Sequence, residues 1–282
     1  MKKAIVLPNI TKDRELLLTK KVADVLFGLG IKVYLEEQYA IEGAYSYYDP
    51  PEDAEVIIVV GGDGSVIDAS RLAVELDIPL LGINLGKVGY LTTLDPDNLD
   101  MLSKLLTDEY IISEKMLLSA EKHVRDVGII QSERLALNDV IVTHDSYLGI
   151  ADFKVENACG DSVIYRADGV VVSTPSGSTA YSLSAGGPVI SHTLDSIMVT
   201  PVCPHSFFNR AIVYGPEEKI RITNLSDISL NISVDGRLFS SLSKDEYCLI
   251  QKSDRRVKIL TFNESNLFAT LSKKIKLLHD SV

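Results

Sequence analysis

One stretch constrains the fold of this chain more than any other: residues 54–76 read AEVIIVVGGDGSVIDASRLAVEL. A run of β-branched residues ends at Gly61, and after the glycine-rich turn the apolar residues take the spacing of a helix. A continuous apolar run of this kind is typical of a strand in a parallel sheet that is covered on both faces. The stretch therefore predicts a strand, a turn and a helix, with the carboxylate of Asp63 placed between glycines at the end of the strand.

The rest of the chain divides by its hydrophobic pattern. Before residue 112, strand-like runs such as KKAIVLPN, IKVYL and IPLLGIN alternate with segments of helical spacing. From about Lys115 the sequence is β-rich, and ISLNISV alternates strictly before the hairpin signal Asp235-Gly236. We predict an α/β, Rossmann-like domain over 1–112, an all-β, β-sandwich-like domain over 113–255, and a C-terminal segment, 256–282, whose helix packs back on the first domain.

Composition excludes several classes of protein. The 282 residues carry a net charge of -11, which disfavours binding to nucleic acid or to anionic membranes. We find no secretion signal and no apolar run long enough to span a bilayer. The three widely spaced cysteines argue against a disulfide framework and favour a cytoplasmic protein.

The glycine-rich turn has the properties of a phosphate site. Gly62 and Gly64 allow a ligand to approach the main chain closely, and the N-terminus of the following helix attracts anions. Ser65 and Asp68 have the spacing of a capping box. A carboxylate beside a bound phosphate could take a proton from an attacking hydroxyl or hold a metal ion. The alternative is a tight turn in which Asp63 is only a local cap.

A second unusual block, YRADGVVVSTPSGSTAYSLSAGGPVI, begins at Tyr165. After a short apolar strand it holds almost only small residues, whose exposed backbone groups could bind an adenine or a diphosphate, and Tyr181 could stack on a base. Arg166 and Asp168 flank the strand as a candidate anion binder and a hydrogen-bond acceptor. The alternative is a surface loop with a buried tyrosine.

Other polar residues are less informative. Asn138 and Asp139 stand just before a strand, where they could bind ribose hydroxyls or form a turn. His144 and His205 lack partners at metal-ligand spacing, so we expect structural histidines, more firmly for His144.

Taken in order, GGDGS, GINLGKVGYL, LNDV, the long block above, TPVCPHSFFNR and SVDGR resemble the NAD kinase family, whose members phosphorylate the adenosine-ribose 2′-hydroxyl of NAD to give NADP. The resemblance covers nearly the whole chain and is carried chiefly by the long block. It implies a dinucleotide site between an N-terminal α/β domain and a C-terminal β domain. Asp63 would be the general base, with Gly62 and Gly64 beside it.

The resemblance also assigns the other binding residues. Tyr90 matches an aromatic residue near the adenine, and Asn138 and Asp139 match ribose and phosphate contacts. Arg166 and Asp168 match positions near the nicotinamide that reach a neighbouring subunit's site. The adenosine-binding stretch corresponds to Thr179, Ala180, Tyr181, Ser182, Leu183 and Ser184.

The resemblance implies a homo-oligomer, dimer or tetramer, that uses Mg²⁺ or Mn²⁺ with ATP or polyphosphate as phosphoryl donor. Three positions depart from the family pattern: Ser65 replaces threonine or asparagine, Asp68 stands where some members carry a basic residue, and Arg237, a candidate nicotinamide-pocket residue, stands where glutamine is frequent. Ser65 keeps a hydroxyl, whereas Asp68 and Arg237 leave the choice between NAD and NADH open, and Asp68 also leaves the choice of phosphoryl donor open. Two other functions also stay open: a kinase for a lipid or sugar phosphate, and a module that senses NAD without chemistry.

Overall fold

The computed structural model describes residues 2–86, 89–124, 127–144, 150–263, 270–272 and 276. The chain forms two compact units, one of residues 1–114 with 257–282 and one of residues 115–256. The first is α/β and the second is all-β, which confirms the predicted fold class. The expected C-terminal helix lies largely outside the described residues. Within the described residues, no helix is both long and apolar enough to cross a membrane.

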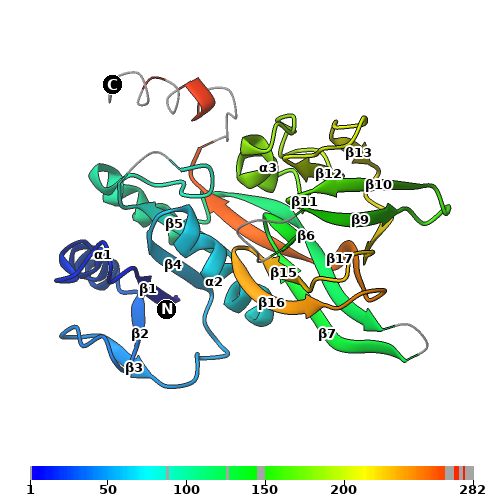
Figure 1. The fold of residues 1–282 in the computed structure, drawn as a ribbon. Helices are drawn as coiled ribbons and strands as arrows, with labels where there is room; N and C mark the ends of the chain where they lie inside the picture. Colours follow the sequence, from blue (N-terminus) through cyan, green and yellow to red (C-terminus); the bar gives the residue numbers. More distant parts are fainter. Residues whose placement is uncertain are drawn as a thin grey trace. The chain divides into compact units, whose positions relative to one another are not determined.

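The first unit is built on a parallel sheet with the strand order β5-β4-β1-β2-β3 (Figure 1). Its apolar strands are buried on both faces, as the continuous run 56–60 predicts. The end of β17 (Tyr247–Thr261) joins this sheet in parallel, with Ile259 opposite Leu80. The strands are β1 (Lys3–Pro8), β2 (Lys32–Glu36), β3 (Tyr45–Tyr47), β4 (Val56–Gly61) and β5 (Leu80–Asn84).

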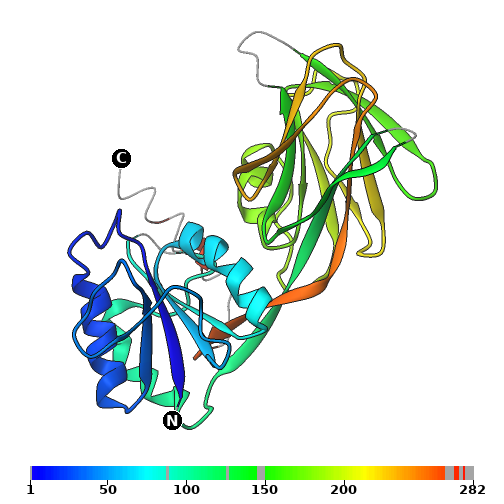
Figure 2. The same ribbon diagram turned by 90° about the horizontal axis from the view of Figure 1, so that it is seen from below.

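Helices cover both faces of this sheet. Helix α1 (Leu17–Gly28) and the 3₁₀ helix η1 (Pro96–Leu105) pack on the face that carries Val56, Ile58 and Val60. Helix α2 (Asp63–Leu76) packs on β4 and β5 from the other face, and Figure 2 shows the blue α1 and the cyan α2 on opposite sides of the strands. The segment 96–105 is a 3₁₀ helix with non-helical backbone angles at Asn98.

The second unit packs two antiparallel sheets around one core. One sheet has the order β13-β12-β11-β8-β15-β16, and the other contains β10-β9-β14-β17 with β6 and β7. Residues of both sheets alternate into the shared core, so the predicted sandwich is confirmed. The strands are β6 (Ile111–Val124), β7 (Gly128–Ala136), β8 (Asp139–His144), β9 (Ala151–Glu156), β10 (Ser162–Ala167), β11 (Gly169–Ser173), β12 (Ile197–Val202), β13 (Ile212–Tyr214), β14 (Lys219–Asn224), β15 (Leu230–Val234) and β16 (Arg237–Leu242).

Two local predictions in this unit have clear outcomes. The hairpin turn between β15 and β16 is confirmed, with left-handed backbone at Asp235 (φ 49°) and Gly236 (φ 74°) that matches the twist of the strands. The segment after β11, expected to lack secondary structure, contains the 3₁₀ turn η2 (Gly177–Thr179) and the short helix α3 (Tyr181–Ser184). A hydrogen bond of 3.0 Å from the Ala185 N–H to the Tyr181 carbonyl closes that short helix.

Leu26 offers a test of the α1 packing. Its side chain is fully buried, whereas Leu17 on the same helix is 60% exposed. We expect Leu26→Ala to lower the free energy of unfolding by about 2–5 kcal/mol, because it leaves a cavity under the helix. The matched change Leu17→Ala should stay within about 0.5 kcal/mol of the parent protein. Urea unfolding of the two variants measures both values, and equal losses would contradict this packing.

Candidate functional site

The glycine-rich turn joins β4 directly to α2. Gly62 is the N-cap residue, the helix begins at Asp63, and no side chain caps it. The predicted capping box is therefore wrong. Ser65 lies inside the first turn, where its backbone N–H already bonds the Gly62 carbonyl at 2.9 Å, and its hydroxyl accepts a hydrogen bond of 2.7 Å from the Asn9 amide nitrogen.

The Asp63 carboxylate is held by the backbone of another segment. It accepts hydrogen bonds from three successive N–H groups, those of Tyr90 (2.9 Å), Leu91 (2.9 Å) and Thr92 (3.3 Å). The alternative in which Asp63 only caps its own helix is thus wrong. The structure brings the predicted residues Gly62, Asp63, Gly64 and Tyr90 together at the end of β4. Burial and the Asp63 charge raise the pKa of Tyr90.

Gly89 permits this arrangement. A side-chain Cβ there would come within 2.2 Å of the Asp63 Oδ1 atom, so any other residue would displace the carboxylate. Sequence reasoning selected Tyr90 from this segment but missed the glycine before it. The available signal was the second glycine of GKVGYL, which stands directly before Tyr90.

A second carboxylate organises the all-β unit in the same manner. Asp235 accepts hydrogen bonds from the N–H groups of Leu137 (2.8 Å), Asn138 (2.8 Å) and Asp139 (3.2 Å). The sequence predicted Asp235 only as a turn residue, yet it fixes the backbone that carries both predicted ribose ligands. Arg237 begins β16 just after this turn, is exposed, and lies at the same end of the sheet.

The loop after β11 packs against this backbone. The Thr174 hydroxyl donates to the Leu137 carbonyl at 2.6 Å, and the Thr174 N–H donates to the Asn138 carbonyl at 2.9 Å. A Cβ on Gly177 would lie 2.0 Å from that same Asn138 oxygen, so only glycine fits. These contacts place the start of η2 next to Asn138.

The predicted adenosine-binding stretch is mostly accessible. Thr179 and Ala180 are half-buried, and Leu183 and Ser184 are exposed. Tyr181 is 41% exposed, so the alternative of a buried tyrosine in a surface loop is wrong. Ser182 differs from the others because it is fully buried. Its hydroxyl lies 2.9 Å from the Thr200 hydroxyl, which gives it a partner within the protein.

Among the predicted binding residues, Asp139 is a buried carboxyl group whose pKa is shifted. Burial, with a smaller contribution from the Asp235 charge, raises the pKa of Asp139 to about 7. Its neighbour across the sheet is Ser173, whose buried hydroxyl has no hydrogen-bond partner among the described residues. A carboxyl group in this setting can hold a proton near neutral pH and donate a hydrogen bond.

Asp168 directly precedes β11 at the end opposite Ser173, roughly 16–17 Å away at about 3.3 Å per residue, and Arg166 lies in β10 just before it. Arg166 is exposed, and its backbone bonds to Ser206 and His205. The Asp168 carboxylate lies 3.7 Å from Nε2 of the largely buried His144. The residues predicted to bind the dinucleotide in this unit therefore form two separate groups rather than one.

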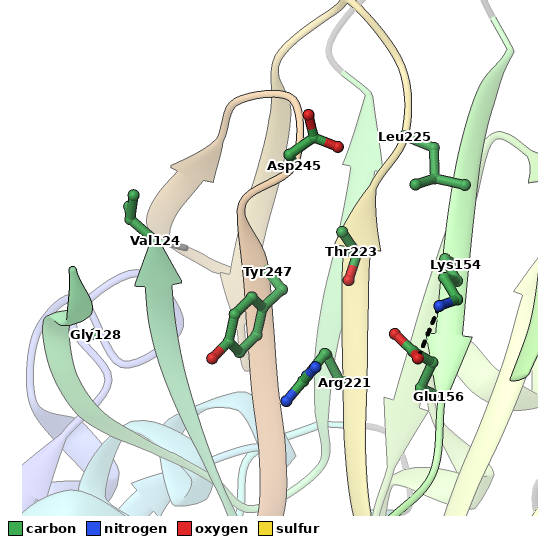
Figure 3. A pocket seen from close by; sticks show the side chains of 9 residues that line it. All are labelled: Val124, Gly128, Lys154, Glu156, Arg221, Thr223, Leu225, Asp245 and Tyr247. Atoms are coloured by element: carbon green, nitrogen blue, oxygen red, sulfur yellow. Dashed lines mark hydrogen bonds and ion pairs between the residues drawn. The ribbon is translucent and has the colours of Figure 1, made fainter. Parts of the chain in front are cut away.

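Two further features of the described residues are the distribution of possible metal ligands and a cavity away from the predicted site. Among them, no three His, Cys, Asp or Glu side chains are grouped as a protein-held metal site requires. A cavity of about 450 Å³ on the outer face of the second unit contains an Arg221 guanidinium stacked over the ring of Tyr247, and an ion pair of 2.8 Å between Lys154 and Glu156 (Figure 3). None of the predicted site residues lines it.

The α/β unit carries a glycine-rich turn before α2, and a glycine-containing loop of the all-β unit packs on Asn138. Comparisons with known proteins identify the family. Residues 49–110 match the ATP-NAD kinase N-terminal domain, and residues 137–262 match the ATP-NAD kinase C-terminal domain. The chain therefore belongs to the ATP-NAD kinase family.

Individual relatives agree with this assignment. The chain is 35% identical to an NAD kinase of Caldanaerobacter subterraneus, over 98% of this chain and 99% of the relative, and 39% identical to one of Lachnospira eligens, over 87% and 84%. An Archaeoglobus fulgidus NAD kinase solved in complex with ATP has a TM-score of 0.73 at 26% identity, covering 96% of this chain and 99% of that one. Yeast NADH kinase complexed with NADH has a similar fold, with a TM-score of 0.81 at 20% identity, over 96% and 86%.

The buried Asp139 predicts a dependence of stability on pH. Its pKa is about 7 in the folded protein and about 3.9 when unfolded, so between these values the folded state holds a proton that the unfolded state has lost. The free energy of unfolding should therefore fall as pH rises from about 4 to about 7, by up to roughly 4 kcal/mol from this group. Asp139→Asn should remove this part of the dependence.

Urea unfolding at several pH values measures, for each variant, the slope of the free energy of unfolding against pH. The matched control is Asp254→Asn, because Asp254 is an exposed aspartate of the same unit. Its slope should equal that of the parent protein. An unchanged slope in Asp139→Asn would show that Asp139 is ionised in the folded protein.

Proposed function

We propose that this protein transfers the γ-phosphoryl group of ATP to the 2′-hydroxyl of the adenosine ribose of NAD and so makes NADP. The observation that carries the proposal is the Asp63 carboxylate, fixed by three backbone N–H groups at the start of α2. The family and the named relatives support the reaction. Phosphoryl transfer depends mainly on positioning and on charge stabilisation, and this turn supplies both.

Asp63 acts as the general base in this proposal. It accepts the proton of the ribose hydroxyl while the oxygen attacks the γ-phosphorus, and the bond from that phosphorus to the bridging oxygen breaks. The hydrogen bonds from residues 90–92 keep the carboxylate in one orientation, so the base need not rearrange during the reaction. The backbone of Gly62 and Gly64 and the α2 N-terminus bind the transferred phosphate.

The dinucleotide is bound by the residues that Asp235 and the loop after β11 position. Asn138 and Asp139 bind ribose hydroxyls, the stretch 179–184 binds the adenosine, and Tyr181 stacks on the base. Tyr90 contacts the adenine. Arg166 and Asp168, at the far end of β11, serve the nicotinamide end of a site in a neighbouring subunit, which requires a homo-oligomer. Arg237 lies near the nicotinamide.

Magnesium or manganese completes the proposal. A divalent ion that arrives with the phosphates of ATP needs few protein carboxylates, which fits the residues present. Bound there, it neutralises charge on the donor. The three free cysteines, two of them exposed, support a reducing, cytoplasmic setting.

The first test of the mechanism is Asp63→Asn. We expect NADP formation from NAD, ATP and magnesium to slow by about two to four orders of magnitude, because the substituted amide cannot accept the proton. Affinity for NAD should stay close to that of the parent protein. The exposed Asp24 on α1 gives a control, since Asp24→Asn has the same charge change and should keep the full rate.

A near-normal rate in Asp63→Asn would remove Asp63 from the mechanism. NAD binding without turnover in the parent protein would favour the sensor function instead. NADH in a parallel assay determines whether Arg237 and Asp68 alter the preference for the oxidised dinucleotide.

Tyr181 tests the proposed adenosine site. Tyr181→Ala should weaken NAD binding by roughly fivefold to a hundredfold, because stacking of a base on an aromatic ring contributes about 1–3 kcal/mol. Tyr181→Phe retains the ring and should bind nearly normally. Isothermal titration with NAD measures both affinities. An unchanged affinity in Tyr181→Ala would exclude stacking on this ring.

A further inference from the structure

The first unit contains a cavity of about 370 Å³ beside its edge strand β3. The residues that line it come from the ends of β2 and β3, from the connections that follow these strands, and from α2; they include Glu36, Glu37, Tyr47, Tyr48 and Leu72. This volume falls in the range of sites that hold small molecules. None of the residues proposed above to bind the dinucleotide or to take part in phosphoryl transfer lines this cavity.

The cavity forms where one face of the sheet carries no helix. The side chains of Val33 and Leu35 belong to the core under α1, so Tyr34 and Glu36 point to the opposite face. On that face, α2 packs on β4 and β5. The connections 37–44 and 48–55 are fully described and contain no helix. No helix of the described residues therefore covers β2 and β3 on this face.

Strand register places a carboxylate next to a buried hydroxyl group. Glu36 and Tyr47 are direct partners in the parallel pair of β2 and β3, so their side chains lie on the same face. Tyr47 is only 9% exposed, and its hydroxyl group has no hydrogen-bond partner among the described residues. Burial, and next the Glu36 charge, raise the pKa of Tyr47, so the hydroxyl keeps its proton. Buried polar groups in proteins have hydrogen-bond partners as a rule, and a bound ligand can supply this one.

The charged residues that line the cavity are all acidic. Glu36 and Glu37 line it, and no lysine or arginine does. The Glu36 carboxylate accepts a hydrogen bond of 2.5 Å from the Gln38 amide, and the Glu37 N–H donates to the Tyr47 carbonyl at 3.0 Å. Across the part of the chain that the structure describes, neither carboxylate forms an ion pair. The surrounding segment, residues 34–53, has six acidic residues and no lysine or arginine, so the complementary ligand is a cation.

The aromatic and apolar walls determine which kind of cation fits. The Tyr48 side chain is 88% exposed, so the face of its ring is open to an ammonium group. On the same face of the sheet, the Lys32 ammonium already lies over the ring of Tyr45, 5.6 Å from its centroid. Leu72 and Pro50 offer apolar surface to methylene groups. A divalent metal ion instead needs about six oxygen ligands, and no three His, Cys, Asp or Glu side chains of the described residues are grouped to hold one.

We propose that this cavity binds a linear aliphatic polyamine such as spermidine. One ammonium group lies between the Glu36 carboxylate and the Tyr47 hydroxyl, to which it donates hydrogen bonds. A second ammonium group lies between the Glu37 carboxylate and the ring of Tyr48. The methylene chain that joins them packs on Leu72. This site is distinct from the proposed dinucleotide and phosphate sites and adds a binding function to the protein.

Matched changes of charge test this site against general attraction of polycations to an acidic chain. Glu36→Gln/Glu37→Gln removes the two carboxylates of the cavity. Glu42→Gln/Glu52→Gln removes two carboxylates that are exposed in the same segment and do not line the cavity. Tyr47→Phe removes only the buried hydroxyl. The probes are spermidine, putrescine and Mg²⁺, each titrated calorimetrically into the parent protein and the three variants.

We expect the parent protein to bind spermidine with a dissociation constant of about 1 mM or lower. Glu36→Gln/Glu37→Gln should weaken this binding by about tenfold to a hundredfold, because hydrogen bonds between charged groups are lost. Tyr47→Phe should weaken it by about threefold to tenfold, the effect of a single hydrogen bond. Glu42→Gln/Glu52→Gln should bind spermidine as the parent protein does. Unchanged midpoints of thermal unfolding show that the variants are folded.

Putrescine and Mg²⁺ carry the same charge, so their comparison isolates the contribution of the methylene chain. We expect putrescine to bind more tightly than Mg²⁺. Equally tight binding of Mg²⁺, lost in Glu36→Gln/Glu37→Gln, would overturn the polyamine site in favour of a metal site. Equal weakening of spermidine binding in the two double variants would show general electrostatic attraction and overturn the site, as would no binding to the parent protein. NADP formation is measured separately, so these outcomes leave the proposed function standing.

Discussion

Three successive backbone N–H groups, those of residues 90–92, hold the Asp63 carboxylate in place, and the proposed chemistry depends on this contact. It joins the end of β4 to the segment after β5, which are neighbouring strands of one parallel sheet. Gly89 is required because its missing side chain leaves room for the carboxylate. The Asp63 carboxylate is therefore held in position by main-chain N–H groups.

The all-β unit uses the same device at Asp235. One carboxylate satisfies the N–H groups of Leu137, Asn138 and Asp139, and the loop around Thr174 and Gly177 then packs on the fixed segment. Buried backbone N–H groups need acceptors, and a carboxylate can serve several at once. One carboxylate therefore fixes the backbone that carries Asn138 and Asp139, although it lies almost a hundred residues away in the sequence.

The sequence predicted local structure correctly at positions where the residues present are compatible with few backbone conformations. The Asp235-Gly236 hairpin and the strand, glycine turn and helix around Asp63 are confirmed because left-handed backbone and a buried parallel strand each leave a strong signal. The capping box failed because Ser65 has the right spacing but lies inside the helix. Asp235 was missed as a backbone acceptor, since its partners are almost a hundred residues away in the sequence.

The sequence by itself determined the two fold classes and the family resemblance and nominated candidate site residues, because hydrophobic period and glycine placement are local properties. Only the tertiary structure decided how these residues are grouped. Strand register places Asn138 and Asp139 at one end of β11 and Arg166 and Asp168 at the other. It also places Glu36 beside Tyr47 at the cavity of the first unit. These relations join segments far apart in the chain, and packing rather than local propensity sets them.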